Sequence, residues 1–498
     1  MENHILSIEN QTKKRIFKKY FILFFVFILY IFSHELKNTN TTQLFNSISN
    51  RLIKDEFFKK ENEKCDILDP IYIMSQRFQK NPNIICKSET SEHLCYRSSI
   101  YDYYNKLYRF PYGIICTIKN FILDPSKSFQ SNLKYKGPID DINRGSAILS
   151  NGFFKINCKL KSNFKTFSKL YKNYIDSWEY QDENEKFSNL EELAPGKTIF
   201  LISRNQDSPN LFHGISELIN ALCIIYLFNL KPEDIQIVFL ESMILENEPL
   251  YELYTRIISR GSKPLYLRDL NKRYFISSAI NIPVAGDSPL FMFIKGHDCK
   301  YSIKTYKILN KLINKYLNIS IFHDSFISDN KTYYYPELTI RNHKLNKKFS
   351  KIITFQWRKV WPEGRTKQKR ILGNGPELVE MLANNLPNDF LIRLIDTASL
   401  SIIDQISLMK NTDYFIGVHG AGLSLSIFMP NNSILFEITP YKKNKLLLLM
   451  SKLSGHKTYS EIIKSKTLFI NKNEYIFFEG SNFIESILKN MKYNKFIK

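Results

Sequence analysis

Residues 413–440 constrain the fold of this chain more than any other segment. They open with an apolar run, 414–418, that predicts a buried strand, and a His-Gly-Ala-Gly turn follows before an apolar stretch with helical spacing. After a Pro-Asn-Asn break comes a second predicted strand, 433–438, with one acidic residue, Glu437. A strand that passes through a small-residue turn into a helix is the repeating unit of parallel α/β sheets.

The turn between these strands has the chemistry of an anion site. Backbone N–H groups at a helix amino terminus point outward, and the helix dipole favours negative charge there. Gly420 and Gly422 let the backbone approach a ligand such as a phosphate closely, and Glu437 is placed to accept ribose hydroxyls. The segment therefore predicts half of a nucleotide site, although an ordinary packed turn is the alternative. The candidate residues are His419, Gly420, Ala421, Gly422, Ser424 and Glu437.

The segment resembles the C-terminal signature of glycosyltransferase family 61. In that family a strand is followed by His-Gly-Ala-Gly-Leu-Thr-Asn, by Phe-x-x-Pro and by a second strand with Glu and Pro. The matching residues here are His419, Gly420, Ala421, Gly422, Leu423, Ser424, Phe428, Pro430, Glu437 and Pro440. Leu425 departs from the pattern, because the family usually has Asn there. The resemblance implies a transferase that uses a nucleotide sugar.

The residues before the signature extend the same pattern. A predicted strand at 351–356, a helix starting at 375, a strand at 389–396 and a helix at 400–410 lead into it. This alternation predicts a parallel sheet with crossover helices. Arg358 follows the first of these strands, and a guanidinium offers a fixed fork to phosphate oxygens. We expect Arg358 to contact the diphosphate of the donor; a solvated basic loop is the alternative.

The middle of the chain predicts a second βαβ unit. Strands are expected at 197–203, 235–240 and 264–267, with helices at 214–228 and 251–259. His213 and Glu217 are four residues apart, so both face one side of the first helix. A histidine has a pKa near neutrality and suits a general base, and Glu217 can orient its ring or act as the base itself. Helix capping or core packing is the alternative for His213. Asp207 and the pair His297-Asp298 are weaker candidates.

The N-terminal end predicts the compartment. Residues 1–15 end in the basic run Lys13, Lys14 and Arg15. Residues 16–33 are long enough to cross a thin bilayer when Lys18 and Lys19 reach the headgroups, and 34–60 form a polar stem. The Phe32–Glu35 segment offers no small-residue site for a signal-peptide cut. We therefore expect a cytosolic tail, a signal-anchor transmembrane helix and a luminal remainder in the Golgi or endoplasmic reticulum membrane.

Composition limits the class of protein. The chain has 498 residues with 44% hydrophobic content, which suits two globular domains beyond the stem, expected at 61–330 and 331–498. The net charge of +22 is spread over scattered lysines. No zinc pattern or RNA-binding signature accompanies it, so we expect no nucleic-acid partner. No Cys/His spacing or Asp-x-Asp strand end suggests a metal site.

Seven cysteines follow the predicted anchor, which allows up to three disulfides in an oxidising lumen. Cys86 and Cys95 are expected to form a local pair, and Cys223, in an apolar helix, is expected to be a buried thiol. Sequons for N-glycosylation occur at Asn40, Asn318, Asn330 and Asn431. Asn431 is expected to lie inside the nucleotide-site loop and to stay unmodified.

Together these features predict an α/β protein of GT-B type, with two Rossmann-like domains facing a cleft and a single N-terminal transmembrane helix. A final helix at 482–491 is expected to return to the first domain. The resemblance implies an inverting, metal-independent transfer of N-acetylglucosamine or xylose from a UDP-sugar, a co-substrate rather than a cofactor, to a glycan or glycoprotein hydroxyl. Two alternatives stay open: a glycan-binding pseudoenzyme of the same fold, motivated by Leu425, and a membrane-tethered polyanion binder.

Overall fold

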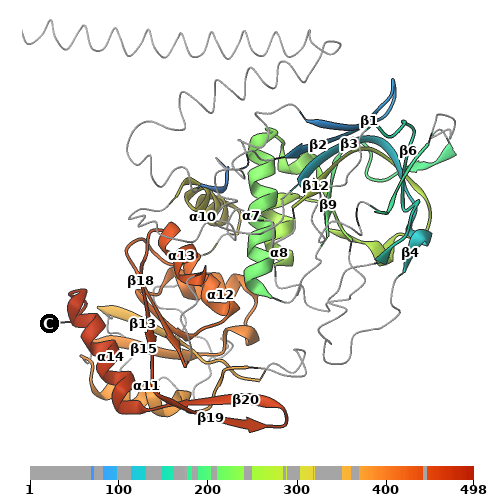
Figure 1. The fold of residues 1–498 in the computed structure, drawn as a ribbon. Helices are drawn as coiled ribbons and strands as arrows, with labels where there is room; N and C mark the ends of the chain where they lie inside the picture. Colours follow the sequence, from blue (N-terminus) through green and yellow to red (C-terminus); the bar gives the residue numbers. More distant parts are fainter. Residues whose placement is uncertain are drawn as a thin grey trace, which may run out of the picture. The chain divides into compact units, whose positions relative to one another are not determined.

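In the computed structural model, a five-stranded sheet carries the signature segment (Figure 1). All of its neighbouring strands are parallel, so their carboxyl ends lie at one edge, and the predicted parallel α/β pattern is confirmed. In spatial order the strands are β15 (Phe390–Ile395), β13 (Lys351–Gln356), β16 (Tyr414–Val418), β17 (Ile434–Thr439) and β18 (Lys457–Ile462).

The structure describes only part of the chain. The described residues are 69–71, 74, 82–97, 114–129, 148–161, 174, 176–181, 189–203, 210–240, 250–283, 288, 303–317, 319, 350–360, 369–387, 389–440 and 446–497. Within these ranges, no helix has the length and apolar character that a membrane crossing requires. The predicted tail, anchor and stem lie outside them, as do Cys65, Cys299, Asp207, His297, Asp298 and the sequons at Asn40, Asn318 and Asn330.

Four helices pack with this sheet: α11 (Gly375–Asn384), α12 (Ile402–Lys410), α13 (Leu446–Leu453) and α14 (Gly480–Tyr493). The amino-terminal cap of α12 is Ser401, whose hydroxyl accepts from the N–H of Asp404 at 3.1 Å. The prediction for the last helix is wrong. Helix α14 lies against α11 (Figure 1). Its Phe483 and Ile487 share an apolar core with Phe355 of β13, because packing on its own sheet removes these side chains from water.

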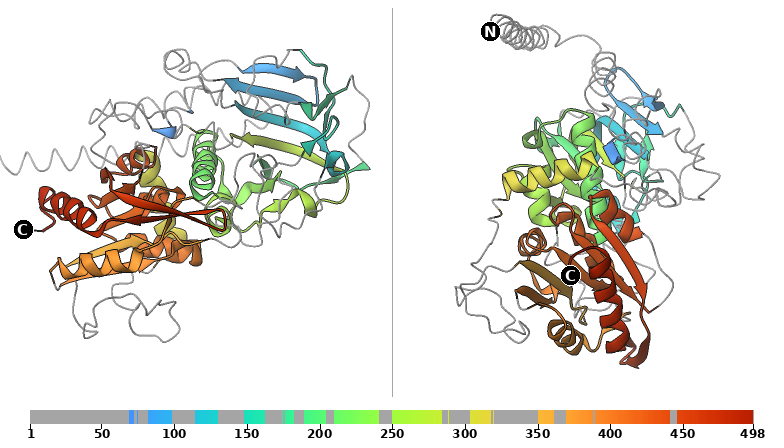
Figure 2. Two further views of the ribbon diagram at one scale, coloured as in Figure 1. Left: turned by 60° about the horizontal axis from the view of Figure 1, so that its bottom comes forward. Right: turned by 90° about the vertical axis from the view of Figure 1, so that its left-hand side faces the viewer.

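A second, ten-stranded sheet is built from the N-terminal half (Figure 2). Its main path is β1 (Asn83–Lys87), β2 (Glu92–Arg97), β3 (Ile114–Leu123), β12 (Tyr274–Ile282), β9 (Thr198–Ile202), β10 (Ile235–Phe239) and β11 (Leu265–Tyr266). The last four strands are parallel to one another, as the βαβ pattern predicts. Strands β1 to β3 join β12 in antiparallel pairing. Three short strands complete it: β6 (Phe154–Ile156), β7 (Trp178–Tyr180) and β8 (Glu191–Glu192).

Helix α7 (Leu211–Leu227) is the central helix of this half. Asn210 caps it by accepting from the N–H of Phe212 at 3.1 Å. The segment predicted as one helix at 251–259 is a short α-helix, α8 (Tyr251–Leu253), that continues as a π-helix, Tyr254–Ile258. A further helix, α10 (Lys304–Tyr316), contacts α7. One apolar core contains side chains of α7, α10, α12 and α13, so helices from both halves of the chain share it.

A small third sheet consists of β14 (Ile371–Leu372), β20 (Asn473–Phe478) and β19 (Ser465–Ile470). Strands β19 and β20 form a hairpin whose two turn residues, Asn471 and Lys472, have φ of 49° and 66°. Two consecutive positive φ angles are typical of the type I′ turn, which matches the twist of a hairpin. The remaining strands, β4 (Ser128–Phe129) and β5 (Ile148–Leu149), pair with each other.

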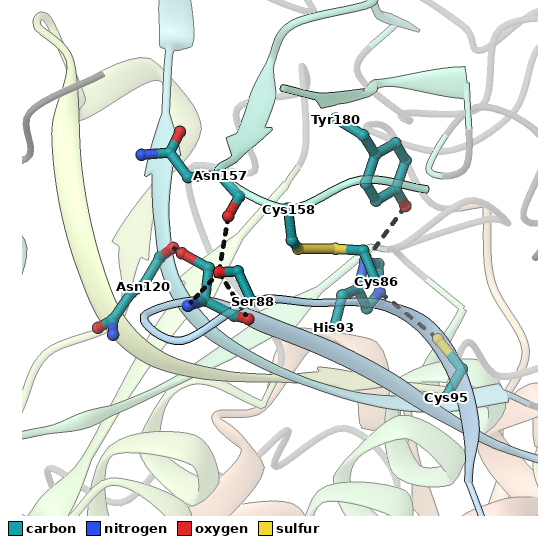
Figure 3. The surroundings of a disulfide bond; sticks show 9 residues. Cys86, Ser88, His93, Cys95, Asn120, Asn157, Cys158 and Tyr180 are labelled. Carbon is teal, nitrogen blue, oxygen red and sulfur yellow. Dashed lines mark hydrogen bonds between the residues drawn. A yellow bond between two sulfur atoms is a disulfide. The ribbon is translucent and has the colours of Figure 1, made fainter. Parts of the chain in front are cut away.

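Two disulfides hold the antiparallel part of the ten-stranded sheet, Cys86–Cys158 and Cys95–Cys116. Figure 3 shows the Cys86–Cys158 bond. The predicted Cys86–Cys95 pair is therefore wrong. Cys95 lies directly opposite Cys116 across β2 and β3, and this register favours the bond that forms. Cys223 is buried and is not part of a disulfide, as predicted. The disulfides indicate an oxidising compartment.

Candidate functional site

The carboxyl edge of the five-stranded sheet brings three of the predicted donor-side residues together. Arg358 follows β13 by two residues, and His419 follows β16 directly. Glu437 lies near the end of β17, paired in register with Gly417. Because the three strands are adjacent and parallel, the residues at their carboxyl ends share one edge of the sheet.

His419 is held by Glu437. The ring Nδ1 of His419 contacts Oε1 of Glu437, and the backbone N–H of His419 donates to the carbonyl of Ile438 at 3.0 Å. The Glu437 side chain is fully buried, whereas that of His419 is 15% exposed. The second carboxylate oxygen of Glu437, Oε2, is buried and has no hydrogen-bond partner among the described residues. A buried carboxylate oxygen without a partner is costly, so a ligand hydroxyl would satisfy it.

The glycines of the turn make room for two protein side chains. A Cβ at Gly420 would collide with the guanidinium of Arg358, and a Cβ at Gly422 would collide with the side-chain amide of Gln356. Gln356, the last residue of β13, donates from Nε2 to the hydroxyl of Thr397 at 2.8 Å. The His-Gly-Ala-Gly turn thus fixes Arg358 against the backbone at the start of the next helix.

Arg370 brings a second guanidinium to this edge. Arg358 Nε donates to the carbonyl of Lys369 at 3.2 Å, and the N–H of Leu372 donates to the carbonyl of Arg358 at 2.9 Å, so residues 369–372 run along Arg358. Burial and the neighbouring Arg370 lower the pKa of Arg358 to about 10. Burial also lowers the pKa of Arg370, an effect that Glu474 and Glu437 oppose.

This pair of guanidiniums can bind an anion. Both remain protonated near neutral pH, and their mutual repulsion disfavours the empty arrangement. The Nε of Arg370 is buried and has no hydrogen-bond partner in the described part of the chain. A diphosphate between them would supply negative charge and hydrogen-bond acceptors in the geometry that guanidiniums prefer.

The helix after the turn differs in type from the prediction. Residues Ala421–Phe428 form a 3-10 helix, η11, whose Ser424 is buried and donates its hydroxyl to the carbonyl of Ala421 at 2.6 Å. Leu425 is fully buried and lies in the apolar core that η11 shares with α7. The side chain at the position that departs from the family pattern therefore packs in the core.

The structure places His213 and Glu217 on α7, a helix that contacts η11. His213 is partly exposed near the start of α7, and Glu217, one turn later, is 2% exposed. The ring of Phe212 lies 6.0 Å from that of His213. His213 and Glu217 thus lie on α7, whereas His419 and Glu437 lie at the ends of β16 and β17. Helix α7 packs against η11, which follows His419.

The sequence predicted no role for two residues of this edge, Arg370 and Gln356. Arg370 has φ of 63°, an unusual conformation for a side-chain-bearing residue, and this backbone shape carries no sequence signal. Gln356 ends a predicted buried strand, and only the collision geometry at Gly422 reveals its position.

Asn431 lies at the edge of the sheet opposite this site. The N–H of Ile434 donates to the carbonyl of Asp413 and the N–H of Lys457 to that of Ser433, so the 430–433 turn lies where β16, β17 and β18 begin. Asn431 is exposed. The expectation that it lies in the same loop as the predicted nucleotide site is wrong, because the His419–Gly422 turn is at the carboxyl edge.

The candidate metal ligands that cluster in the described residues are His93, Cys95 and Cys116. The two sulfurs are joined to each other in a disulfide, so they are not thiolate ligands. His93 instead lies between the Cys95 sulfur, 3.5 Å from Nε2, and the Tyr180 hydroxyl, 3.2 Å from Nδ1 (Figure 3). The cluster belongs to the disulfide-bonded core.

Part of the chain is similar to known proteins. Residues 292–436 match the family model described as Glycosyltransferase 61, which includes Arg358, Arg370 and the turn from His419 to Gly422. The EGF domain-specific O-linked N-acetylglucosamine transferase of Mus musculus is 35% identical over 92 residues, which are 18% of this chain and 17% of that protein. The same-named protein of Drosophila melanogaster is 36% identical over 74 residues, 15% of this chain and 14% of its own length. This chain thus matches less than a fifth of the length of these relatives. Residues 292–436 are thus similar to glycosyltransferase family 61.

Proposed function

We propose that the chain is an inverting glycosyltransferase that moves N-acetylglucosamine or xylose from a UDP-sugar to a hydroxyl of a glycoprotein or glycan. The observation that carries the proposal is the pairing of Arg358 and Arg370 beside the His419–Glu437 contact at the carboxyl edge of a parallel sheet. Ligands of open α/β sheets bind outside this edge.

In this proposal the donor diphosphate lies against the two guanidiniums. They stabilise the negative charge that develops as the bond from the anomeric carbon to the diphosphate oxygen breaks. No metal is needed for this role, because Arg358 and Arg370 supply the positive charge. The buried Oε2 of Glu437 accepts a ribose hydroxyl of the uridine, which satisfies that oxygen.

His213 is the proposed general base. It removes the proton of the acceptor hydroxyl while the oxygen attacks the anomeric carbon from the face opposite the diphosphate, so the configuration inverts. Glu217, on the same face of α7 and nearly fully buried, orients the ring or takes the proton itself. The contact between α7 and η11 supports a common site for these residues and the donor edge.

A GT-B arrangement accounts for the two sheets. We assign the acceptor side to residues 61–330 and the donor side to residues 331–498. The parallel strands β12, β9, β10 and β11 in one and the five parallel strands in the other support two Rossmann-like units. The relatives' names support a protein acceptor, and the two disulfides support action in the secretory pathway. Anchorage of residues 16–33 in a Golgi or endoplasmic reticulum membrane is part of the proposal.

The second candidate is a glycan-binding pseudoenzyme, which the replacement of the usual Asn by Leu425 motivates. Burial of Leu425 in the core supports turnover instead, because a side chain there does not reach the guanidinium pair. The two candidates differ in the release of UDP from the donor, which a pseudoenzyme does not catalyse.

Thermal unfolding with a panel of nucleotides and UDP-sugars, with EDTA throughout, tests the proposal. A ligand at a hundred times its dissociation constant stabilises the folded state by about 2.7 kcal/mol. We expect stabilisation by UDP and by one UDP-sugar, and none in Arg358→Ala. Absence of a shift with every nucleotide would refute the donor site. Stabilisation without sugar transfer or UDP release would favour the pseudoenzyme.

A further inference from the structure

A row of polar side chains crosses the five-stranded sheet near its carboxyl edge. The register aligns Gln356 of β13 with Gly417 of β16, and Gly417 with Glu437 of β17. It also aligns Glu437 with Ser460 of β18. Side chains alternate between the two faces of a strand, and residues in register on neighbouring parallel strands share a face. Glu437 and Ser460 therefore lie side by side on one face of the sheet.

Both residues have a buried polar atom without a partner. The Glu437 side chain is fully buried, and Ser460 is 9% exposed. Among the described residues, neither Oε2 of Glu437 nor Oγ of Ser460 has a hydrogen-bond partner, so the two are not bonded to each other. The other carboxylate oxygen, Oε1, contacts His419, which follows β16 on the far side of β17 from β18. Such buried atoms are costly unless a ligand or a water satisfies them.

The same face of the sheet is more exposed one row farther out. Ile462 of β18 lies two residues beyond Ser460 and is in register with Thr439 of β17. Residues two apart in a strand share a face, so Ile462 lies on the face of Ser460. Ile462 is 56% exposed, and the side chain of His419 is 15% exposed. A ligand at the carboxyl edge therefore approaches the two unpartnered atoms from this row.

The chemistry of the two atoms fits the diol of a ribose. A carboxylate oxygen only accepts hydrogen bonds, whereas a serine hydroxyl donates and accepts. The two ribose hydroxyls are on neighbouring carbons and on the same side of the ring, so one can donate to Glu437 while the other bonds Ser460. Neighbouring strands are about 4.8 Å apart, a separation that two hydrogen bonds to such a diol can span.

The distance to the guanidinium pair favours the ribose over the base. Glu437 acts electrostatically on Arg370, so the carboxylate lies near the proposed diphosphate site. In UDP the ribose is attached to the diphosphate, and the uracil lies beyond the ribose. The group that reaches Glu437 and its neighbour Ser460 first is therefore the ribose.

We propose that Ser460 binds one hydroxyl of the donor's ribose while Glu437 binds the other, so that the site selects a ribonucleoside diphosphate over its deoxy analogues. The inference rests on the proposed transferase function and adds Ser460 as a residue that determines donor specificity. Ser460 lies outside residues 292–436, the segment that matches the family model.

The test is isothermal titration calorimetry of the full chain with UDP, 2′-deoxy-UDP and 3′-deoxy-UDP. Ser460→Ala leaves no protein group unsatisfied, because its Oγ has no partner among the described residues. Ser451→Ala is the matched control: Ser451 of α13 is fully buried, and its Oγ also lacks a partner in the described part of the chain. Its carbonyl accepts from the N–H of His456, which precedes β18, so it lies toward the opposite edge of the sheet.

We expect the unaltered chain to bind each deoxy analogue at least fivefold more weakly than UDP, the effect of one hydrogen bond. Ser460→Ala should bind UDP about fivefold more weakly, yet bind one analogue as the unaltered chain does, because that analogue lacks the hydroxyl that Ser460 contacts. Glu437→Gln should lose discrimination against the other analogue. Ser451→Ala should bind all three nucleotides as the unaltered chain does.

Three results would overturn the inference. One is an equal loss for all three nucleotides in Ser460→Ala, since the serine would then act through Glu437 or a bound water. The others are unchanged UDP binding in Ser460→Ala and equal affinity of the unaltered chain for UDP and both analogues. Each of them leaves the donor site standing as long as the unaltered chain binds UDP, whereas no UDP binding in the unaltered chain would refute the proposed donor site itself.

Discussion

The guanidinium of Arg358 occupies the space that a β-carbon at Gly420 would take, with Cζ 3.0 Å from that position. The glycine is therefore required by a protein side chain that the turn must admit. Gly420 has extended backbone, φ 170°, which any residue can adopt, so space rather than conformation excludes other residues.

The first prediction follows from this packing. Gly420→Ala should displace Arg358 and abolish stabilisation by UDP, measured as the shift in melting temperature. Gly196→Ala is the control: Gly196 has open space but φ of 73°, so alanine strains the backbone by about 1–2 kcal/mol without moving Arg358. A normal UDP response in Gly420→Ala would contradict the assigned role of Arg358.

Arg370 should contribute to diphosphate binding. Arg370→Gly keeps the positive φ and removes the guanidinium, so we expect the Kd for UDP to rise at least tenfold, from the loss of a charge-assisted hydrogen bond of about 1.5–3 kcal/mol. Arg370→Lys should lose less, because it keeps the charge but not the fork. Isothermal titration calorimetry measures both. If the glycine variant and the unaltered chain bind UDP with equal affinity, Arg370 does not contact the diphosphate.

Glu437 should contribute to binding of the nucleoside part of UDP and not of the diphosphate. Glu437→Gln keeps an oxygen for His419 but loses one of the two carboxylate acceptors. We expect its Kd for UDP to rise about tenfold while inorganic pyrophosphate binds as tightly as before or more tightly. Arg358→Ala, in contrast, should weaken both ligands. Equal losses for UDP and pyrophosphate in Glu437→Gln would indicate that the carboxylate acts indirectly, through His419 or Arg370, and not on the ribose.

His213 should act on turnover rather than donor binding. His213→Ala is expected to lower kcat by about 10²-fold or more, the range for removal of a general base. The UDP-induced shift in melting temperature should not change. Tyr226→Ala, an exposed residue on the same helix, controls for disturbance of α7. A loss of UDP binding in His213→Ala would indicate a donor contact instead.

Two buried histidines should make the fold acid-sensitive. Burial lowers the pKa of His93 to about 3 and that of His456 to about 4. In the unfolded chain both histidines have a pKa of about 6.5. The unfolded state therefore binds more protons below pH 6.5, and the stabilisation present above that pH is lost as the pH falls. As the pH falls from 6.5 to 5, each histidine should lower the free energy of unfolding by about 2 kcal/mol.

Urea unfolding at these two pH values measures the loss. His456→Gln should reduce the pH dependence by about half of the histidine contribution, because His93 remains. Most carboxylates titrate below pH 5, so the stability lost between pH 6.5 and 5 is due mainly to the histidines. An unchanged free energy of unfolding from pH 6.5 to 5 in the unaltered chain would contradict the burial of both rings.

Local pattern predicted the parallel strands and crossover helices around the donor site. The predicted strand at 414–418 and the helix at 400–410 agree with β16 and α12 within two residues. Apolar runs of this kind are buried on both faces, and Ser401 marks a helix start, so the signal is contained in a short window.

Non-local geometry could not be predicted in the same way. The pairing of Cys95 with Cys116 depends on the register of β2 and β3, and two cysteines nine residues apart gave no such information. The approach of Arg370 to Arg358 depends on a positive φ and on one backbone contact. The hairpin of β19 and β20 was missed because its exposed apolar residues hide the alternation typical of a half-buried strand.

The apolar core common to α7 and η11 has a consequence for any attempt to isolate the donor-binding half. Leu423, Leu425 and Ile427 are at most 1% exposed, and their neighbours in that core include Phe212 and Leu218 of α7. A fragment that begins at residue 331 would leave these side chains in water and would associate through them. The parts of the chain before and after residue 331 are thus expected to unfold together in one thermal transition.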